Sequence, residues 1–146
     1  MIAIGSDHAG FTYKEQLKQL LQNEGFSFKD FGTYKPDATD YPDIAHYVSD
    51  AVAGGEYEKG ILICGTGIGM SIVANKHKGI RAAVCESIKS AQLAREHNNA
   101  NILCLGERIT PWNTSSEIIK TFLSTQFSGN ERHQCRIQKI HTLTNL

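Results

Sequence analysis

The residues best suited to chemistry lie in the segment Gly60–Gly69, where a short apolar run ends at Cys64 and opens at once into alternating glycines. The apolar run is typical of a strand buried on both faces, and the glycines favour a turn whose bare backbone can approach a ligand. The pattern then predicts a helix over Met70–His77, whose free N–H groups and positive dipole end would point back at the turn. A thiol at such a junction should ionise more easily than a free one. One loop would therefore carry both a base and donors for an oxyanion, which suits proton abstraction next to a carbonyl.

The glycine loop is similar to two nucleotide-binding loops without matching either. Gly65-x-Gly67-x-Gly69 continues with Met70 where a dinucleotide fingerprint would have a glycine, and the Gly-Lys-Ser/Thr ending of a P-loop is absent. A glycine-rich turn can also be purely structural, and Cys64 alone would more often be a buried core thiol. The core interpretation gives no reason for three glycines in five positions, so their adjacency favours a functional loop.

Other polar side chains lie at the ends of predicted elements, and each has a structural as well as a functional interpretation. Asp7 and His8 lie between two glycines after a predicted strand, where an aspartate commonly bonds the local backbone. His97 and Asn98 end a predicted helix, where both residue types are common for dipole and capping reasons alone. Tyr41 could equally pack on the start of its own helix.

Two arginines are spaced for one helix face. Arg132 and Arg136 are four residues apart, so on a helix they would repel each other unless an anion lies between them. A solvated surface is the default interpretation. Phosphate is the obvious bridging anion, because arginine presents forked donors to it, and Arg108 could join the pair. The remaining histidines have no metal-ligand spacing, so we predict no metal.

Strand-like and helical segments alternate along the whole chain. We predict strands over Ile2–Gly5, Phe26–Phe31, Ile61–Cys64, Ile80–Cys85 and Asn101–Leu105. Helical periodicity fills the segments between them, with Pro42 opening one helix, Thr110-Pro111 capping another and a last helix beginning near Asn130. This order predicts a Rossmann-like α/β fold, a three-layer sandwich with a five-stranded parallel sheet. Ligands bind such sheets outside the carboxyl ends of the strands, where many of the polar candidates would gather.

Composition narrows the class of protein. A chain of 146 residues is expected to form a single domain over 1–146. Fifteen basic and fifteen acidic residues give no net charge, which argues against general binding to nucleic acid or anionic membranes. We expect neither a membrane span nor a secretory leader. The four cysteines are scattered, so we interpret them as reduced thiols of a cytoplasmic protein.

Taken together, these residues resemble the ribose-5-phosphate isomerase B family, the group that also contains galactose-6-phosphate and allose-6-phosphate isomerases. The resemblance runs from Ile2 to about Ile140. It rests on separated blocks in the right order: Gly5–Phe11, Thr39–Pro42, Gly60–Gly69, Ala74–Lys76, Gly79–Ala82, Ser90–Leu93, His97-Asn98 and Arg132-His133-x-x-Arg136.

The resemblance implies a cofactor-free aldose–ketose isomerase that interconverts ribose 5-phosphate and ribulose 5-phosphate through a cis-enediolate, in the non-oxidative branch of the pentose phosphate pathway. Cys64 matches the base whose thiolate carries a proton between C2 and C1 of the open-chain sugar. His97 matches the histidine that opens the furanose ring, and Asp7 matches its helper at the ring oxygen. Thr66 would help to move a proton between the sugar oxygens. The backbone anion hole matches Gly65, Thr66, Gly67, Ile68 and Gly69.

The remaining matches concern substrate contact and assembly. Tyr41 and Asn98 match positions that touch the substrate, and the phosphate-binding set matches His8, Arg108, Arg132 and Arg136. The family forms homodimers or dimers of dimers with sites shared between chains. By this resemblance, His97, Asn98 and Arg108 would come from a different subunit than Cys64, and the final helix would pack across the interface.

The chain departs from the family pattern in a few places, and these leave the choice of sugar open. Ser6 replaces a cysteine that is common before Asp-His, and Glu86–Lys89 is atypical. A branch of the family has a glutamate base near the position of Met70, so this chain looks like the cysteine branch. The alternatives are a galactose-6-phosphate or allose-6-phosphate isomerase and, in another class, a non-catalytic sugar-phosphate-binding module. A binding module would need no base.

Overall fold

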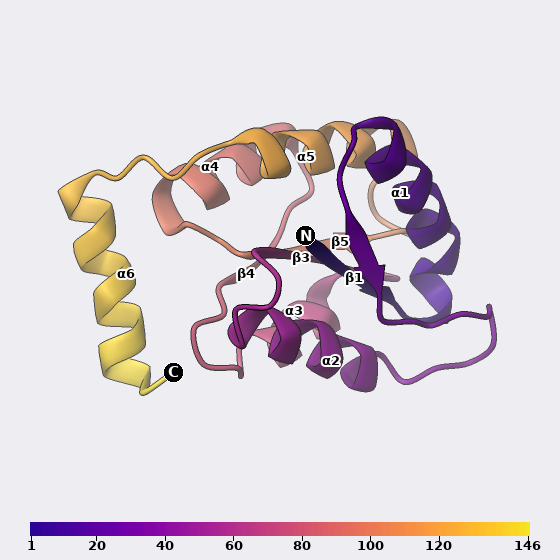
Figure 1. Cartoon of the computed structure of the whole chain (residues 1–146), viewed down its shortest axis with the longest axis horizontal. Helices are drawn as coiled ribbons and strands as arrows, with labels where there is room; N and C mark the ends of the chain where they lie inside the picture. Colours follow the sequence, from indigo (N-terminus) through magenta and orange to yellow (C-terminus); the bar gives the residue numbers. More distant parts are fainter.

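Five parallel strands form the central sheet, in the order β2-β1-β3-β5-β4 (Figure 1). The computed structural model describes all 146 residues. The strands are β1 (Ile2–Ser6), β2 (Phe28–Asp30), β3 (Lys59–Cys64), β4 (Ala82–Val84) and β5 (Ile102–Gly106). The helices are α1 (Phe11–Asn23), α2 (Tyr41–Ala53), α3 (Ile68–Ala74), α4 (Ile88–Asn98), α5 (Trp112–Ser124) and α6 (Glu131–Thr144), with a 3₁₀ turn, η1, over His8–Gly10. The predicted α/β fold with a five-stranded parallel sheet is confirmed.

The strands divide their side chains between two cores because successive residues point to opposite faces. From β3, Ile61 and Ile63 join the core beneath α1, α4 and α5, whereas Leu62 and Cys64 join the core beneath α2 and α3. Figure 1 shows these two helical layers on opposite sides of the sheet. Burial on both faces explains why the central strands are apolar without alternation, and each buried Ile or Leu contributes roughly 1.5–3 kcal/mol.

The strand order creates a crevice at one edge of the sheet. The chain leaves β1 toward β2 on one side and then returns to β3 on the other side of β1. The loops after β1 and β3 therefore run in opposite directions. In open α/β sheets, ligands bind in the crevice between two such loops, at the carboxyl ends of the strands. The loop after β5 lies beside them, since β5 pairs with β3 along its length.

Some predicted boundaries were wrong. The two edge strands are shorter than expected, because each has a neighbour on one side only: β2 spans Phe28–Asp30 and β4 spans Ala82–Val84. The third helix begins two residues earlier than predicted, directly after the left-handed Gly67, and ends at Ala74. Thr110 does not cap α5, because Pro111 occupies the N-cap position and makes no side-chain hydrogen bond there. Thr110 is buried instead, and its carbonyl accepts a hydrogen bond from the Tyr13 hydroxyl at 3.0 Å.

Two further features bear on the chemistry. All four cysteines are free thiols, three of them buried and Cys135 exposed. None of the helices has both the length and the apolar character needed to cross a membrane.

Candidate active site

The crevice at the carboxyl edge of the sheet holds most of the predicted site. It is an open cleft of about 230 Å³. Its lining combines the loops after β1, β3 and β5 with the first residue of α2: Asp7, His8, Ala9, Tyr41, Cys64, Gly65, Thr66, Gly69 and Arg108. The structure thus brings together candidates that lie up to a hundred residues apart in the sequence.

Cys64 lies at the end of β3 with its side chain directed into the core beneath α2 and α3, and 5% of its surface is exposed. Its Sγ accepts a hydrogen bond from the backbone N–H of Gly67 at 3.0 Å, which fixes the sulfur beside the loop that follows β3. Cys85 and Cys104 are different. Burial raises the pKa of both thiols, and neither lines the cleft. Cys64 is therefore the one buried cysteine with an opening to the candidate site.

The loop after Cys64 presents backbone donors to the cleft. Gly67 has a φ of 78°, a left-handed conformation that lets the chain turn from β3 into α3. The N–H groups of Gly65, Thr66 and Gly69 donate to no acceptor within the chain. Three unpaired donors beside a sulfur acceptor form the kind of arrangement that stabilises an oxyanion.

Tyr41 limits the size of residue 69. Its ring lies directly over Gly69, where a Cβ would come within 2.7 Å of two ring carbons. Tyr41 also begins α2 at a proline-containing first turn, as predicted. Tyr41 therefore packs on the glycine loop and lines the cleft, and its contact with a substrate stays a prediction.

Asp7 and His8 are fixed by the backbone around them. Asp7 is buried and its Oδ1 accepts from the N–H of Gly10 at 3.0 Å, which caps η1 and matches the structural interpretation of a local turn. Asp7 nevertheless lines the cleft. The Nδ1 of His8 lies 3.2 Å from the backbone nitrogen of Thr39 and 3.3 Å from its carbonyl oxygen, and these contacts orient the ring.

Arg108 lies beside Cys64 in the same chain. Its backbone N–H donates to the Gly65 carbonyl at 3.0 Å, and its guanidinium covers Gly65, where a Cβ would be 3.2 Å from Nη1. The expectation that Arg108 joins Cys64 only from another subunit is therefore wrong. The loop after β5 runs alongside the loop after β3 because β5 and β3 are hydrogen-bonded neighbours.

His97, Asn98, Arg132 and Arg136 lie elsewhere. Helices of a parallel α/β sheet run antiparallel to the strands, so the end of α4 lies at the amino edge of the sheet, opposite the cleft. Figure 1 shows α6, which carries both arginines, standing apart beside β4 and α4. The structure therefore divides the predicted site into two groups, one at each edge of the sheet.

The second group includes His133, a residue to which the sequence assigned no role of its own. The His133 ring lies against the His97 ring, with centroids 4.3 Å apart, and its Nδ1 lies 2.8 Å from the Ser128 hydroxyl. Burial lowers the pKa of His133, and the neighbouring charges of His97, Arg132 and Arg136 lower it further. The only signal in the sequence was its position next to Arg132.

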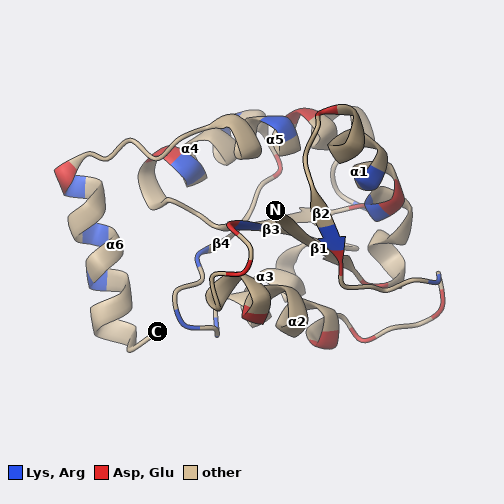
Figure 2. Ribbon diagram, viewed as in Figure 1, with Lys and Arg blue, Asp and Glu red and all other residues tan.

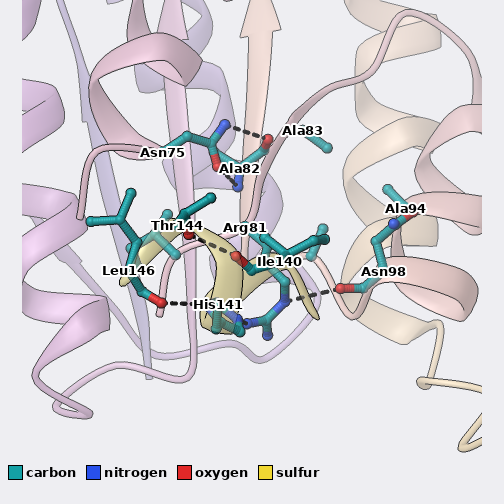
Figure 3. A pocket seen from close by; sticks show the side chains of 12 residues that line it. Asn75, Arg81, Ala82, Ala83, Ala94, Asn98, Ile140, His141, Thr144 and Leu146 are labelled. Carbon is teal, nitrogen blue, oxygen red and sulfur yellow. Dashed lines mark hydrogen bonds between the residues drawn. The ribbon is translucent and has the colours of Figure 1, made fainter. Parts of the chain in front are cut away.

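Arg81 links the end of α4 to the end of α6, as Figure 3 shows. Its Nε donates to the carbonyl of Asn98 at 2.9 Å, and its Nη1 donates to Nε2 of His141 at 2.9 Å. The other ring nitrogen of His141 donates to the terminal oxygen of Leu146 at 2.7 Å. These bonds tie the end of α6 to the end of α4 across a cavity of about 330 Å³.

No three His, Cys, Asp or Glu side chains gather in a group that could hold an ion. His46 and His77 do meet, with Nδ1 and Nε2 2.8 Å apart, but as a hydrogen-bonded pair.

Comparison with known proteins places this geometry in a family. The sequence model of the ribose/galactose isomerase family matches residues 2–140. The ribose-5-phosphate isomerase B of Escherichia coli (strain K12) is 47% identical over 139 residues, which cover 95% of this chain and 93% of that protein.

Solved structures agree with the sequence match. The ribose-5-phosphate isomerase B of Clostridium thermocellum has a TM-score of 0.96 and 46% identity, over 99% of this chain and 97% of that one. The Mycoplasma genitalium enzyme of the same name, solved with bound ribulose-5-phosphate, has a TM-score of 0.94 and 44% identity, over 99% and 95% of the two chains. This chain belongs to the ribose/galactose isomerase family.

Proposed function

We propose that this chain is an aldose–ketose isomerase that interconverts ribose 5-phosphate and ribulose 5-phosphate without a cofactor. The observation that carries the proposal is a single cleft in which the Cys64 sulfur lies next to three unpaired backbone donors. The E. coli relative and the M. genitalium structure with bound ribulose-5-phosphate support the choice of substrate. The reaction would serve the non-oxidative pentose phosphate pathway in the cytoplasm.

In the proposed reaction, His97 opens the furanose ring, and Asp7 assists at the ring oxygen. The Cys64 thiolate then takes the proton from C2 and returns it to C1. The enediolate oxygens accept from the N–H groups of the loop that follows Cys64, each worth about 3 kcal/mol in sites of this kind. Thr66 would pass a proton between the two sugar oxygens. The loop members are Gly65, Thr66, Gly67, Ile68 and Gly69.

We further propose that each complete site is built from two copies of the chain, as a homodimer or a dimer of dimers. The predicted residues are divided between opposite edges of one sheet. A single chain therefore does not bring them together, and this division supports the proposal. One copy would supply Cys64 and its loop, and the other would supply His97 and Asn98. Helix α6 would pack across the interface.

The phosphate of the substrate would lie among His8, Arg108, Arg132 and Arg136. In this chain His8 and Arg108 line the cleft, and Arg132 and Arg136 lie with His97. No carboxylate forms an ion pair with any of these three arginines, so their charge is free for an anion. Tyr41 and Asn98 would contact the sugar.

A hexose 6-phosphate is the second candidate substrate, because the matching family is described by galactose as well as ribose. A coupled assay of ribulose 5-phosphate formation, with a metal chelator present, tests the main proposal. The same preparation with allose 6-phosphate or galactose 6-phosphate tests the second. Turnover of a hexose phosphate above that of ribose 5-phosphate would replace the substrate. Failure to exchange the C2 proton of bound ribose 5-phosphate with deuterated water would leave only a binding module.

A further inference from the structure

Two arginines at the amino edge of the sheet, one buried and one half-buried, have no carboxylate partner in an ion pair. Arg95, on α4, is 6% exposed, and Arg81, just before β4, is half-buried. Every ion pair of the chain is made by a lysine, and none reaches either guanidinium. A buried charge is normally paired with an opposite one, so this arrangement calls for an explanation.

The hydrogen bonds of the two guanidiniums go to neutral acceptors, which are oxygens except for the His141 ring nitrogen bonded by Arg81, and some N–H groups of each guanidinium remain unpaired. Nη1 of Arg95 donates to the Asn99 side chain at 2.9 Å and to the Ala100 carbonyl at 2.6 Å. Nη2 of Arg95 has no acceptor within the chain, yet it is not sealed from solvent. Nη2 of Arg81 donates once, to the Asn99 carbonyl at 2.9 Å. Because a guanidinium has five N–H donors, both groups retain free ones.

Arg81 and Arg95 both line one polar pocket of about 430 Å³, which is separate from the Cys64 cleft. Lys59 also lines the pocket, as does the Asn99 side chain. Glu58 is the only carboxylate of the lining, and it is already paired with Lys59. Figure 2 shows the basic positions on α4, at the start of β3 and before β4 that contribute to this edge. Three cations therefore face one engaged carboxylate.

The electrostatics agree with an uncompensated positive site. Burial lowers the pKa of both guanidiniums, and the charge of Arg95 lowers the pKa of Arg81 further, whereas the charge of Glu58 offsets part of the effect of burial on Arg95. The negative end of the α4 dipole offsets only about half a charge. An anion between the two arginines would remove their repulsion and accept from their free N–H groups in the forked geometry that suits phosphate.

We propose that this pocket is a second anion site, which binds a small oxyanion of the phosphate class through Arg81, Arg95 and Asn99. It lies at the opposite edge of the sheet from Cys64, beneath the turn that ends α4. The site is distinct from the proposed isomerase site, because none of these three residues is assigned a contact with the sugar phosphate; Arg81 also donates to the carbonyl of Asn98.

Thermal unfolding in phosphate, compared with chloride at equal ionic strength, tests the proposal. The experiment uses an Arg108→Gln/Arg136→Gln background, which removes phosphate contacts of the proposed catalytic site. Saturating phosphate should raise the melting temperature of this background by about 3 °C or more above chloride. Arg95→Gln should abolish most of that difference. An equal phosphate response with and without Arg95 would overturn the proposal and reveal only general salt stabilisation.

A second variant keeps the test informative if Arg95→Gln fails to fold. Asn99 and Asn145 both cap helices in the left-handed conformation, with φ of 45° and 58°, and aspartate tolerates that conformation. Asn99→Asp places a carboxylate beside the two arginines, so it should raise the melting temperature in chloride and remove the phosphate response. Asn145→Asp, the matched control, should do neither. Equal behaviour of the two variants would refute the site.

Phosphate esters distinguish the source of the anion. If glycerol 2-phosphate stabilises the background as well as inorganic phosphate does, the pocket accepts the phosphoryl group of a metabolite. If it stabilises less than inorganic phosphate, the ligand is the free ion. Both outcomes support the site, and stabilisation by neither anion would overturn it.

Discussion

Replacing Gly69 by alanine should separate catalysis from stability. The new Cβ would lie 2.7 Å from two ring carbons of Tyr41 and 3.1 Å from its hydroxyl oxygen, whereas ordinary contact begins at 3.4 Å. The ring or the glycine loop must therefore move by about 0.7 Å. Tyr41 is 39% exposed, so the ring has room to turn outward and the fold should survive.

The magnitudes of the two effects differ. Alanine in place of glycine within α3 stabilises the helix by up to about 1 kcal/mol, which offsets part of the strain. We expect the free energy of unfolding to change by less than about 1 kcal/mol. A displacement near 1 Å at a reacting centre costs about a hundredfold in rate, which corresponds to roughly 2.7 kcal/mol. Isomerisation of ribose 5-phosphate should therefore fall by about that factor while unfolding in urea stays nearly unchanged.

A double-mutant cycle checks the cause. In a Tyr41→Ala background the clash is absent, so Gly69→Ala should have little additional effect on kcat/KM, although Tyr41→Ala itself weakens substrate contact. If Gly69→Ala retains activity within about tenfold of wild type, or costs the same with and without the Tyr41 ring, the packing of Tyr41 on Gly69 does not position the loop.

Three other substitutions test the proposed roles. Cys64→Ala should abolish isomerisation while circular dichroism and urea unfolding show an intact fold; residual activity within about tenfold of wild type would remove Cys64 as the base. Arg136→Ala should raise KM for ribose 5-phosphate about tenfold or more with little change in kcat. The control Lys139→Ala, on the same helix, should leave KM unchanged. An unchanged KM in Arg136→Ala would exclude Arg136 from phosphate binding. The pKa of His133 is lowered below its ordinary 6.5, so the unfolded chain binds more protons at this residue than the folded chain does. The free energy of unfolding should therefore fall as the pH drops below about 6.5. His133→Gln should reduce that dependence in urea titrations at pH 5 and 7, and an identical slope would contradict the interpretation.

Local patterns in the sequence were enough to predict where Cys64 and its glycine loop lie. Cys64 and its glycines are adjacent in the chain, and the strand that carries them is marked by an apolar run, so loop and support could be inferred together. The loop after β1 follows from the same rule, because the ends of parallel strands meet at one edge. Here sequence and structure agree because the interactions are short-range.

Long-range packing could not be predicted in the same way. The contact of His97 with His133 joins residues of different helices, and the bonds from Arg81 reach Asn98 and His141 from well outside their elements. No periodicity encodes such pairs. The position of Arg108 beside Cys64 in the same chain was not predicted for a related reason. It depends on the pairing of β5 with β3, which is set by the strand order and not by the loop that carries Arg108.

Mixing two inactive variants tests most directly whether one site is shared between two chains. Cys64→Ala and His97→Ala would each be inactive alone, because each lacks one half of every site. Co-expressed, they should form mixed dimers with one intact site each, so that random pairing restores about a quarter of the wild-type activity. Activity that stays at the level of the separate variants would contradict the account, since Cys64 and His97 would then have to act within one chain or not at all.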